Sequence, residues 1–207
     1  MSMTQRIAEL LIATRNPGKV WEVSEKLNGL PLRLLYLADF PAVQAASETG
    51  VTYLENAIIK ARSYAVQSHC WTLADDSGLE VAALGGAPGP LSARYAGANA
   101  SDAERIERLL QELDRTQDPH RRARFVCAIA LADGAGNIAG TFTGTCEGSI
   151  ARAPRGSHGF GYDPIFIPDG YDKTFGELSA EIKQRISHRA RALEQFAQSL
   201  AGGACLA

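Results

Sequence analysis

Short apolar runs alternate with segments of helical periodicity over the first third of the chain. The runs at 9–14, 32–38 and 71–74 have the length and composition of buried strands. Residues 20–27 place apolar side chains three to four positions apart, which predicts a helix between the first two runs. We therefore expect strands and helices to alternate here, as they do in α/β proteins.

Two later helices are marked by their first residues. Thr52 with Glu55, and Ser101 with Glu104, fit the capping box, in which each side chain bonds the backbone N–H of the other residue. The apolar stripes that follow are Leu54, Ala57, Ile58, Ala61 and Ala65 in one helix, and Ile106, Leu109, Leu110 and Leu113 in the other.

The second half of the chain predicts a hairpin and a closing helix. Apolar segments at 123–132 and 138–151 flank the turn-forming sequence DGAGN, which indicates antiparallel strands. A periodicity over 182–196 predicts one long helix. We expect a mixed sheet with helices packed on it, a second lobe carried by the hairpin, and a ligand site in the cleft between the lobes.

Composition and charge exclude several classes of function. The 207 residues are 45% hydrophobic and 21% charged, which is ordinary for a globular protein. The 21 basic and 23 acidic side chains give a net charge of −2, too small a field to hold a nucleic-acid polymer or an anionic membrane. No apolar run approaches the ~20 residues of a membrane span, and the N-terminus lacks a secretory signal. The four cysteines, without metal-site spacing, indicate reduced thiols and a cytoplasmic protein: Cys70, Cys127, Cys146 and Cys205.

The first strand leads into a candidate phosphate-binding turn. The segment Thr14–Lys19 ends a strand and opens a helix, where free backbone N–H groups and the helix dipole favour an anion. Lys19 adds a positive charge. The segment is not a P-loop, because Ala13 and Val20 replace the glycine and the hydroxyl residue of that motif. A plain turn with a solvated lysine is the alternative.

Two adjacent carboxylates follow the apolar run at 71–74. Asp75 and Asp76 stand where α/β sheets place ligands, and Mg²⁺ prefers carboxylate and phosphate oxygens. Neighbouring strand residues face opposite sides, so we expect the two to differ in role. An Asx-turn at Asp-Ser-Gly is the alternative. Glu48, in a loop, is either a further metal ligand or a solvated acid.

Two later segments carry further candidate chemistry: an aromatic loop that suits a nucleobase, and a cluster of cationic side chains that could help to balance the charge of a triphosphate. In 159–166, glycines allow close approach, Phe160 or Tyr162 suits base stacking, and Asp163 suits a ring N–H; the alternative is that these aromatics fill the core. Lys183, His188 and Arg189 would spread around a regular helix, whereas a break near Ser187 would let them converge. His188 taken alone is more typical of a surface or capping residue.

The order of these motifs resembles that of a known family. TRNPGK, ETGVTYLENAIIKA, ADDSGLEV, LGGAPG with SARYAG, GFGYDPIF and SHR are similar to the inosine triphosphate pyrophosphatase family over nearly the whole chain. The resemblance implies one domain over 1–207, an elongated mixed β-sheet flanked by helices, two lobes with a central substrate cleft, and usually a homodimer. It also implies Mg²⁺-dependent hydrolysis of ITP, dITP and XTP to the monophosphate and pyrophosphate, which clears them from the nucleotide pool.

The resemblance also assigns roles by position. Asp76 resembles the acid that activates water and holds Mg²⁺, and Glu48 a second acid near the metal, although the residues alone leave Asp75 open as the second ligand. The implied substrate contacts are Thr14, Arg15, Asn16, Pro17, Gly18 and Lys19 for the triphosphate, Ser77 beside Asp76, and Phe160, Gly161, Tyr162, Asp163, Lys183, His188 and Arg189 for the base. Arg15, His158 and Ile182 depart from the usual pattern.

Two other functions fit the same residues. One is a nucleotide phosphohydrolase that releases orthophosphate or acts on modified pyrimidine nucleotides. The other is a nucleotide-binding module that has lost catalysis. Neither the preferred base nor the exclusion of guanine follows from the residues.

Overall fold

The computed structural model describes residues 7–201, and these residues form two compact units. The first unit contains residues 7–76, 127–144 and 189–201, and the second contains 77–126 and 145–188. Cys205 lies outside the described residues. Within residues 7–201, the helices are all too short or too polar to cross a lipid bilayer.

Six strands pair in the order β2-β1-β3-β4-β5-β6. β1 runs parallel to β2 and β3, whereas β6 runs antiparallel to β5, so the sheet is mixed as expected. A turn at 133–137 joins the neighbouring strands β4 and β5 in the predicted hairpin. The strands are β1 (Glu9–Ile12), β2 (Arg33–Tyr36), β3 (Thr72–Val81), β4 (Arg122–Ala132), β5 (Ile138–Ile150) and β6 (Phe166–Pro168).

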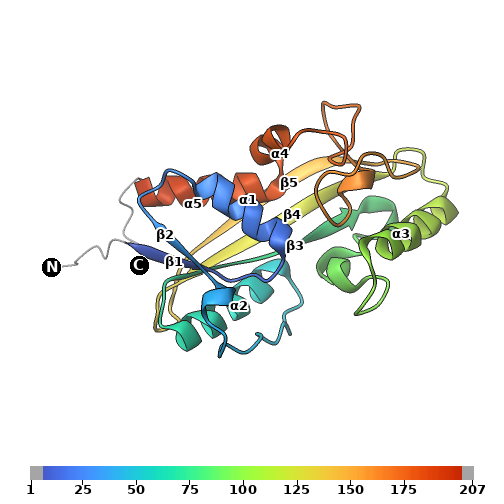
Figure 1. Ribbon diagram of the computed structural model, residues 1–207. Helices are drawn as coiled ribbons and strands as arrows, with labels where there is room; N and C mark the ends of the chain where they lie inside the picture. Colours follow the sequence, from blue (N-terminus) through green and yellow to red (C-terminus); the bar gives the residue numbers. More distant parts are fainter. Residues whose placement is uncertain (1–6, 202–207) are drawn as a thin grey trace. The chain divides into compact units, whose positions relative to one another are not determined.

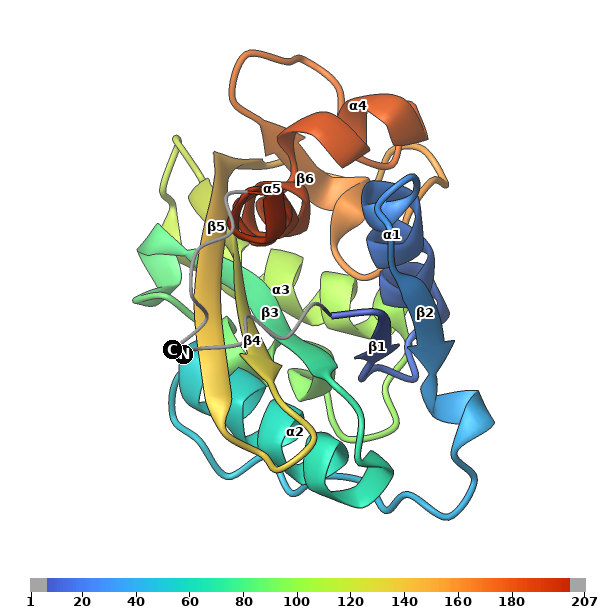
Figure 2. The same cartoon turned by 90° about the vertical axis from the view of Figure 1, so that its left-hand side faces the viewer.

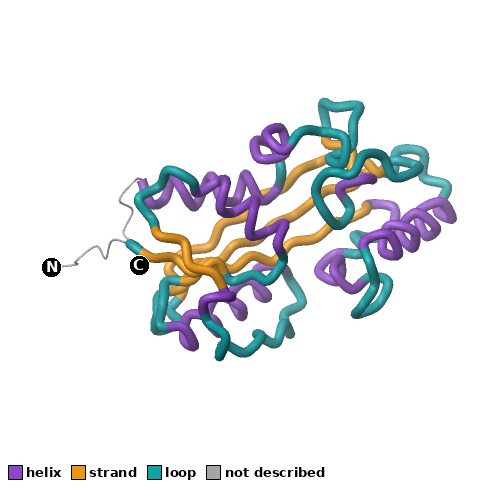
Figure 3. The backbone as a smooth tube through the Cα atoms, viewed as in Figure 1, coloured by secondary structure: helices purple, strands orange, loops and turns teal. Residues whose placement is uncertain are grey.

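Helices flank the strands within each unit. In the first unit, α1 and α5 cover one face of the strands and α2 covers the other (Figures 1 and 2). The α-helices are α1 (Pro17–Leu27), α2 (Tyr53–Ser68), α3 (Asp102–Thr116), α4 (Ala180–Ile186) and α5 (His188–Ala201). Loops, drawn in teal in Figure 3, include residues 40–52 before α2 and most of 151–179.

Each unit has its own apolar core. In the first, Val23 and Leu27 of α1 and Phe196 of α5 pack against Leu10 and Ile129 of the strands. In the second, the inward stripe of α3 packs against the aromatic side chains of β4, β6 and the loop after them. The buried members of that second core include Ile106, Leu109, Leu113, Phe125, Ile150, Phe166 and Phe175. Both capping boxes are present, so the helix starts at α2 and α3 are confirmed.

Three local predictions are wrong, each for a physical reason. β3 does not end at residue 74 but continues to Val81, because cationic side chains neutralise the acids within it; this excludes the Asx-turn. The single long helix predicted over 182–196 is instead two helices, because the backbone of Ser187 is extended. The break suggested near Ser187 is therefore confirmed. Leu54 is exposed rather than inward, because α2 turns the polar side chains of Asn56 and Lys60 toward the sheet.

Candidate active site

The centre of the site in the first unit is a pair of neighbouring acids in β3. Asp75 and Asp76 are both buried, and they contact different helices. Asp75 contacts Lys19 of α1, and Asp76 contacts Lys60 of α2. The two carboxylates therefore point to opposite faces of the strand, as the alternation of strand side chains requires.

Asp75 belongs to a compact group of four charges. Its Oδ2 lies 2.9 Å from Lys19 Nζ and 3.0 Å from a guanidinium nitrogen of Arg189, which also pairs with Glu22. Two cations and two anions balance, which makes their burial tolerable. Burial alone would raise the pKa of Asp75, but the charges of Lys19 and Arg189 outweigh it and hold the pKa far below its usual range.

Asp76 is held from the other side by α2. Lys60 Nζ lies 3.0 Å from Asp76 Oδ1, and Asn56 Nδ2 donates to Oδ2 at 3.4 Å. Burial raises the pKa of Asp76, and the nearby charge of Lys60 offsets only part of this effect. In turn, burial would lower the pKa of Lys60, but the charges of Asp76 and Asp75 reverse this and raise it.

Glu48 lies close to the same lysine. Its Oε2 is 3.4 Å from Lys60 Nζ, so one ammonium group contacts both Glu48 and Asp76. Glu48 is itself largely exposed. Within residues 7–201, no three His, Cys, Asp or Glu side chains gather as a complete metal site. Carboxylate oxygens, together with phosphate oxygens and water, are nonetheless the donors that Mg²⁺ prefers.

The candidate phosphate loop is an ordered helix start. The side chain of Asn16 accepts from Lys19 N at 3.1 Å, and Thr14 Oγ1 accepts from Asn16 N at 3.2 Å. Pro17 occupies the first turn of α1, where its missing N–H costs nothing. Arg15 donates to the backbone oxygen of Val43 at 3.2 Å. The loop thus presents its lysine toward Asp75 instead of leaving it solvated.

The aromatic loop in the second unit is fixed by one buried acid. Asp163 accepts from Phe160 N at 2.8 Å and also pairs with Lys183. Lys183 Nζ lies 4.6 Å from the centre of the Phe160 ring, a cation–π distance. Gly159 has a φ of +76°, and a Cβ there would lie 2.0 Å from Asp163 Oδ2, so only glycine fits.

Two candidate base contacts lie in the core of the second unit. Tyr162 is 4% exposed and donates its hydroxyl to the backbone oxygen of Ser92 at 3.0 Å, which favours a core role for this aromatic. His188 is buried, and its ring stacks on Phe125 with ring centres 4.6 Å apart. Phe160 is the half-buried aromatic of the loop.

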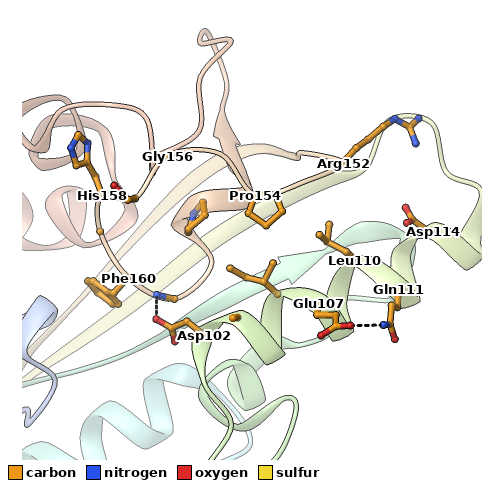
Figure 4. A pocket seen from close by; sticks show the side chains of 16 residues that line it. Asp102, Glu107, Leu110, Gln111, Asp114, Arg152, Pro154, Gly156, His158 and Phe160 are labelled. Atoms are coloured by element: carbon orange, nitrogen blue, oxygen red, sulfur yellow. Dashed lines mark hydrogen bonds between the residues drawn. The ribbon is translucent and has the colours of Figure 1, made fainter.

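A hollow of about 680 Å³ lies beside Phe160 within the second unit (Figure 4). Ile106 and Leu110 of α3 line one side, and the loop at 152–164 lines the other. Asp102 Oδ2 accepts from Gly161 N at 2.7 Å, which ties that loop to the first turn of α3.

The structure divides the predicted site residues into two groups. Lys19, Asp75, Asp76 and Arg189 lie together in the first unit, with Glu48 one contact further through Lys60. In the second unit, Asp163 contacts both Phe160 and Lys183; half-buried Ser77 and Gly161 and the buried Tyr162 and His188 also belong to that unit. Arg189 belongs to the first unit and Lys183 and His188 to the second, and a shared base contact of these three stays a prediction.

Two residues of this arrangement were not assigned a role from the sequence. Glu22 resembles any polar residue of a surface helix, although its position three residues after Lys19 places both on one face of α1. Asn56 stands four residues before Lys60, and this spacing on α2 was the available signal.

Comparison with known proteins finds relatives that match over nearly the whole chain. The model of the Ham1 family matches residues 10–199. A dITP/XTP pyrophosphatase of Coxiella burnetii is 47% identical over 193 residues, 93% of this chain and 96% of that protein. One of Bacillus subtilis is 46% identical over 192 residues, again 93% and 96%. The solved structure of a HAM1 protein from Coxiella burnetii is similar with a TM-score of 0.87 at 45% identity, covering 95% of this chain and 100% of that one.

Proposed function

The chain belongs to the Ham1 family, and from this membership and its site we propose that it hydrolyses non-standard purine nucleoside triphosphates. The substrates are ITP, dITP and XTP, and the products are the nucleoside monophosphate and pyrophosphate. The support is family membership over residues 10–199 together with relatives named dITP/XTP pyrophosphatases at 47% and 46% identity. The expected role is removal of these nucleotides from the cellular pool.

The observation that carries the proposal is the division of roles between Asp75 and Asp76. Asp75 forms ion pairs with Lys19 and Arg189, which hold its side chain in place and keep it charged. Asp76 is the acid next to the second carboxylate, Glu48, through their common contact with Lys60. Asp76 is therefore the group that orients or deprotonates the attacking water, and positioning supplies most of the rate.

The proposal includes Mg²⁺, because this ion prefers carboxylate oxygens combined with phosphate oxygens and water. Asp76 and Glu48 would hold it, and when bound it would neutralise the charge of the triphosphate. Lys19 and the backbone N–H groups at the start of α1 bind phosphate oxygens. The contacts of Thr14, Asn16 and Gly18 with the triphosphate, and of Ser77 beside it, belong to the same proposal.

In the second unit, Phe160 stacks on the base, and the charge of Lys183 behind the ring favours this stacking. A 6-oxo group accepts hydrogen bonds, whereas the amino group of adenine cannot, so donors aimed at that position reject ATP. The proposal further places the enzyme in the cytoplasm as a homodimer. The free thiols of Cys70, Cys127 and Cys146 suit that reducing compartment.

A substrate panel tests the proposal. The purified protein is incubated with ITP, dITP, XTP, GTP, ATP and dUTP, with and without Mg²⁺, and the phosphorus products are separated. We expect pyrophosphate and monophosphate in equal amounts from the first three, only when Mg²⁺ is present. Orthophosphate as the product, or a preference for dUTP, would indicate another nucleotide phosphohydrolase. The absence of any turnover would indicate a binding module.

A further inference from the structure

Asn56 is a buried amide that contacts both Asp76 and the loop that carries Glu48. The residue is 1% exposed. Its Nδ2 donates to Asp76 Oδ2 at 3.4 Å, and its Oδ1 accepts from Gly50 N at 2.9 Å. We propose that Asn56 is a positioning residue: it sets the orientation of the Asp76 carboxylate and the position of the Glu48 loop relative to that carboxylate. The inference rests on the proposed function for its consequence on catalysis.

The loop end at Gly50 is docked closely on α2. A Cβ at Gly50 would lie 2.6 Å from Glu55 Cβ and 2.9 Å from Asn56 Oδ1, so the backbone approaches as closely as glycine allows. The N–H groups of Val51 and Thr52 both donate to Glu55 Oε2, at 2.8 and 3.0 Å. The capping box therefore fixes the chain up to Val51, and Asn56 extends this order to Gly50, two residues from Glu48.

Asn56 and Lys60 together engage both oxygens of Asp76. The two residues are four positions apart, on one face of α2. Lys60 contacts Oδ1 and Asn56 contacts Oδ2, so the carboxylate is held at two points and its rotation is restricted. Lys60 contributes a positive charge, whereas the neutral amide of Asn56 contributes only a directional hydrogen bond that orients the carboxylate. Since the role requires a donor and an acceptor on one short side chain, only an amide of this length fills it among common residues.

Asn56→Asp distinguishes the contact with Asp76 from the contact with Gly50, because it removes the first and keeps the second. A carboxylate of the same shape still accepts from Gly50 N, but it cannot donate to Asp76. We expect kcat for dITP to fall about 10- to 100-fold, the usual cost of losing a group that orients a metal-binding side chain, with KM unchanged. Hydrogen exchange in residues 47–51 of the nucleotide-free protein should match the wild type. Asn56→Leu removes both contacts, so it should lose kcat and also exchange faster in this segment.

Asn99→Asp is the matched control, because it adds the same charge at an exposed position in the second unit. It should leave kcat and exchange unchanged. Asn56→Asp with wild-type kcat, or Asn56→Leu with wild-type exchange at 47–51, would overturn the inference. If Asn56→Asp fails to fold, Asn56→Gln replaces it: the longer stem misplaces the donor and should lower kcat, and wild-type kcat would count against the role. A wild-type protein without turnover would refute the proposed function instead, while the exchange measurement would still test the loop contact.

Discussion

Asp75 and Asp76 are adjacent in the chain and lie in different electrostatic surroundings. Asp75 contacts Lys19 and Arg189, whereas Asp76 contacts Lys60. The expectation that the two acids differ in role follows from strand geometry; their contacts differ accordingly, and the difference in role stays a prediction. The identity of those contacts did not follow, because Arg189 is 114 positions from Asp75 and only the fold brings them together.

The buried guanidinium of Arg189 makes a testable contribution to stability. Arg189→Met would remove the guanidinium that pairs with both Asp75 and Glu22. Removing one partner from a buried ion group typically costs about 3–5 kcal/mol of unfolding free energy, which urea titration measures. Arg62→Met, at an exposed position on α2, is the control and should change the value by less than about 0.5 kcal/mol. Equal stability of the two variants would contradict the ion group as described.

The thiol of Cys127 provides a test that depends on pH. Burial, reinforced by the charge of Asp75, raises the pKa of Cys127 to about 12, above the ordinary value of 9.0. The unfolded chain therefore loses this proton at lower pH than the folded protein, so stability should fall as pH rises from 9 toward 12.

The same thiol should resist alkylation in the folded protein. At pH 8.5, we expect iodoacetamide to label half-buried Cys70 in the native state but to label Cys127 only in denaturant. Peptide mass spectrometry measures both sites in one sample. Native labelling of Cys127 at the rate of Cys70 would show that β4 is not packed here as the structure has it.

At the scale of elements, sequence patterns predicted structure best where the interactions that stabilise it join residues close together in the chain. Both capping boxes form as predicted, because their hydrogen bonds involve residues three apart. The extent of β3 was mispredicted, because Asp-Ser-Gly favours a turn locally, whereas the cations that neutralise its two acids, Lys19, Lys60 and Arg189, come from helices distant in the sequence. The break at Ser187 was suggested because a regular helix would have directed the side chains of Lys183, His188 and Arg189 to different sides of its axis.

The loop that carries Phe160 should depend on Gly159 more than on Gly161. Both have positive φ, +76° and +62°, so alanine is strained at either position, at a typical cost of about 1–2 kcal/mol. At Gly159 the added Cβ would also lie 2.0 Å from Asp163 Oδ2, whereas nothing lies within 4 Å at Gly161. We expect Gly159→Ala to lower unfolding free energy further and to raise KM for dITP. Urea titration and initial rates compare the two, and equal effects would contradict the described packing of Asp163.

For the whole molecule, the alternation of strand and helix patterns predicted the mixed sheet, which is confirmed, whereas the assignment of chemistry to particular segments stays a prediction. The sequence did not predict how the cationic residues divide between the units. Lys183 pairs with Asp163 in the second unit, while Arg189, only six residues later, pairs with Asp75 in the first. The extended Ser187 lets the chain pass from one unit to the other within two residues. Spacing along a helix cannot reveal such a division, because it depends on which carboxylates are buried nearby.

We propose that Asp76, and not its neighbour Asp75, activates the water in the hydrolysis that releases pyrophosphate. Single-turnover cleavage of dITP with Mg²⁺ in ¹⁸O-labelled water tests this most directly, in wild type and Asp76→Asn. We predict pyrophosphate without label, labelled dIMP, and a loss of about 10²–10⁴-fold in rate for Asp76→Asn, in a variant that remains folded. Labelled pyrophosphate, orthophosphate as the product, or an Asp76→Asn variant as fast as the wild type would contradict the account.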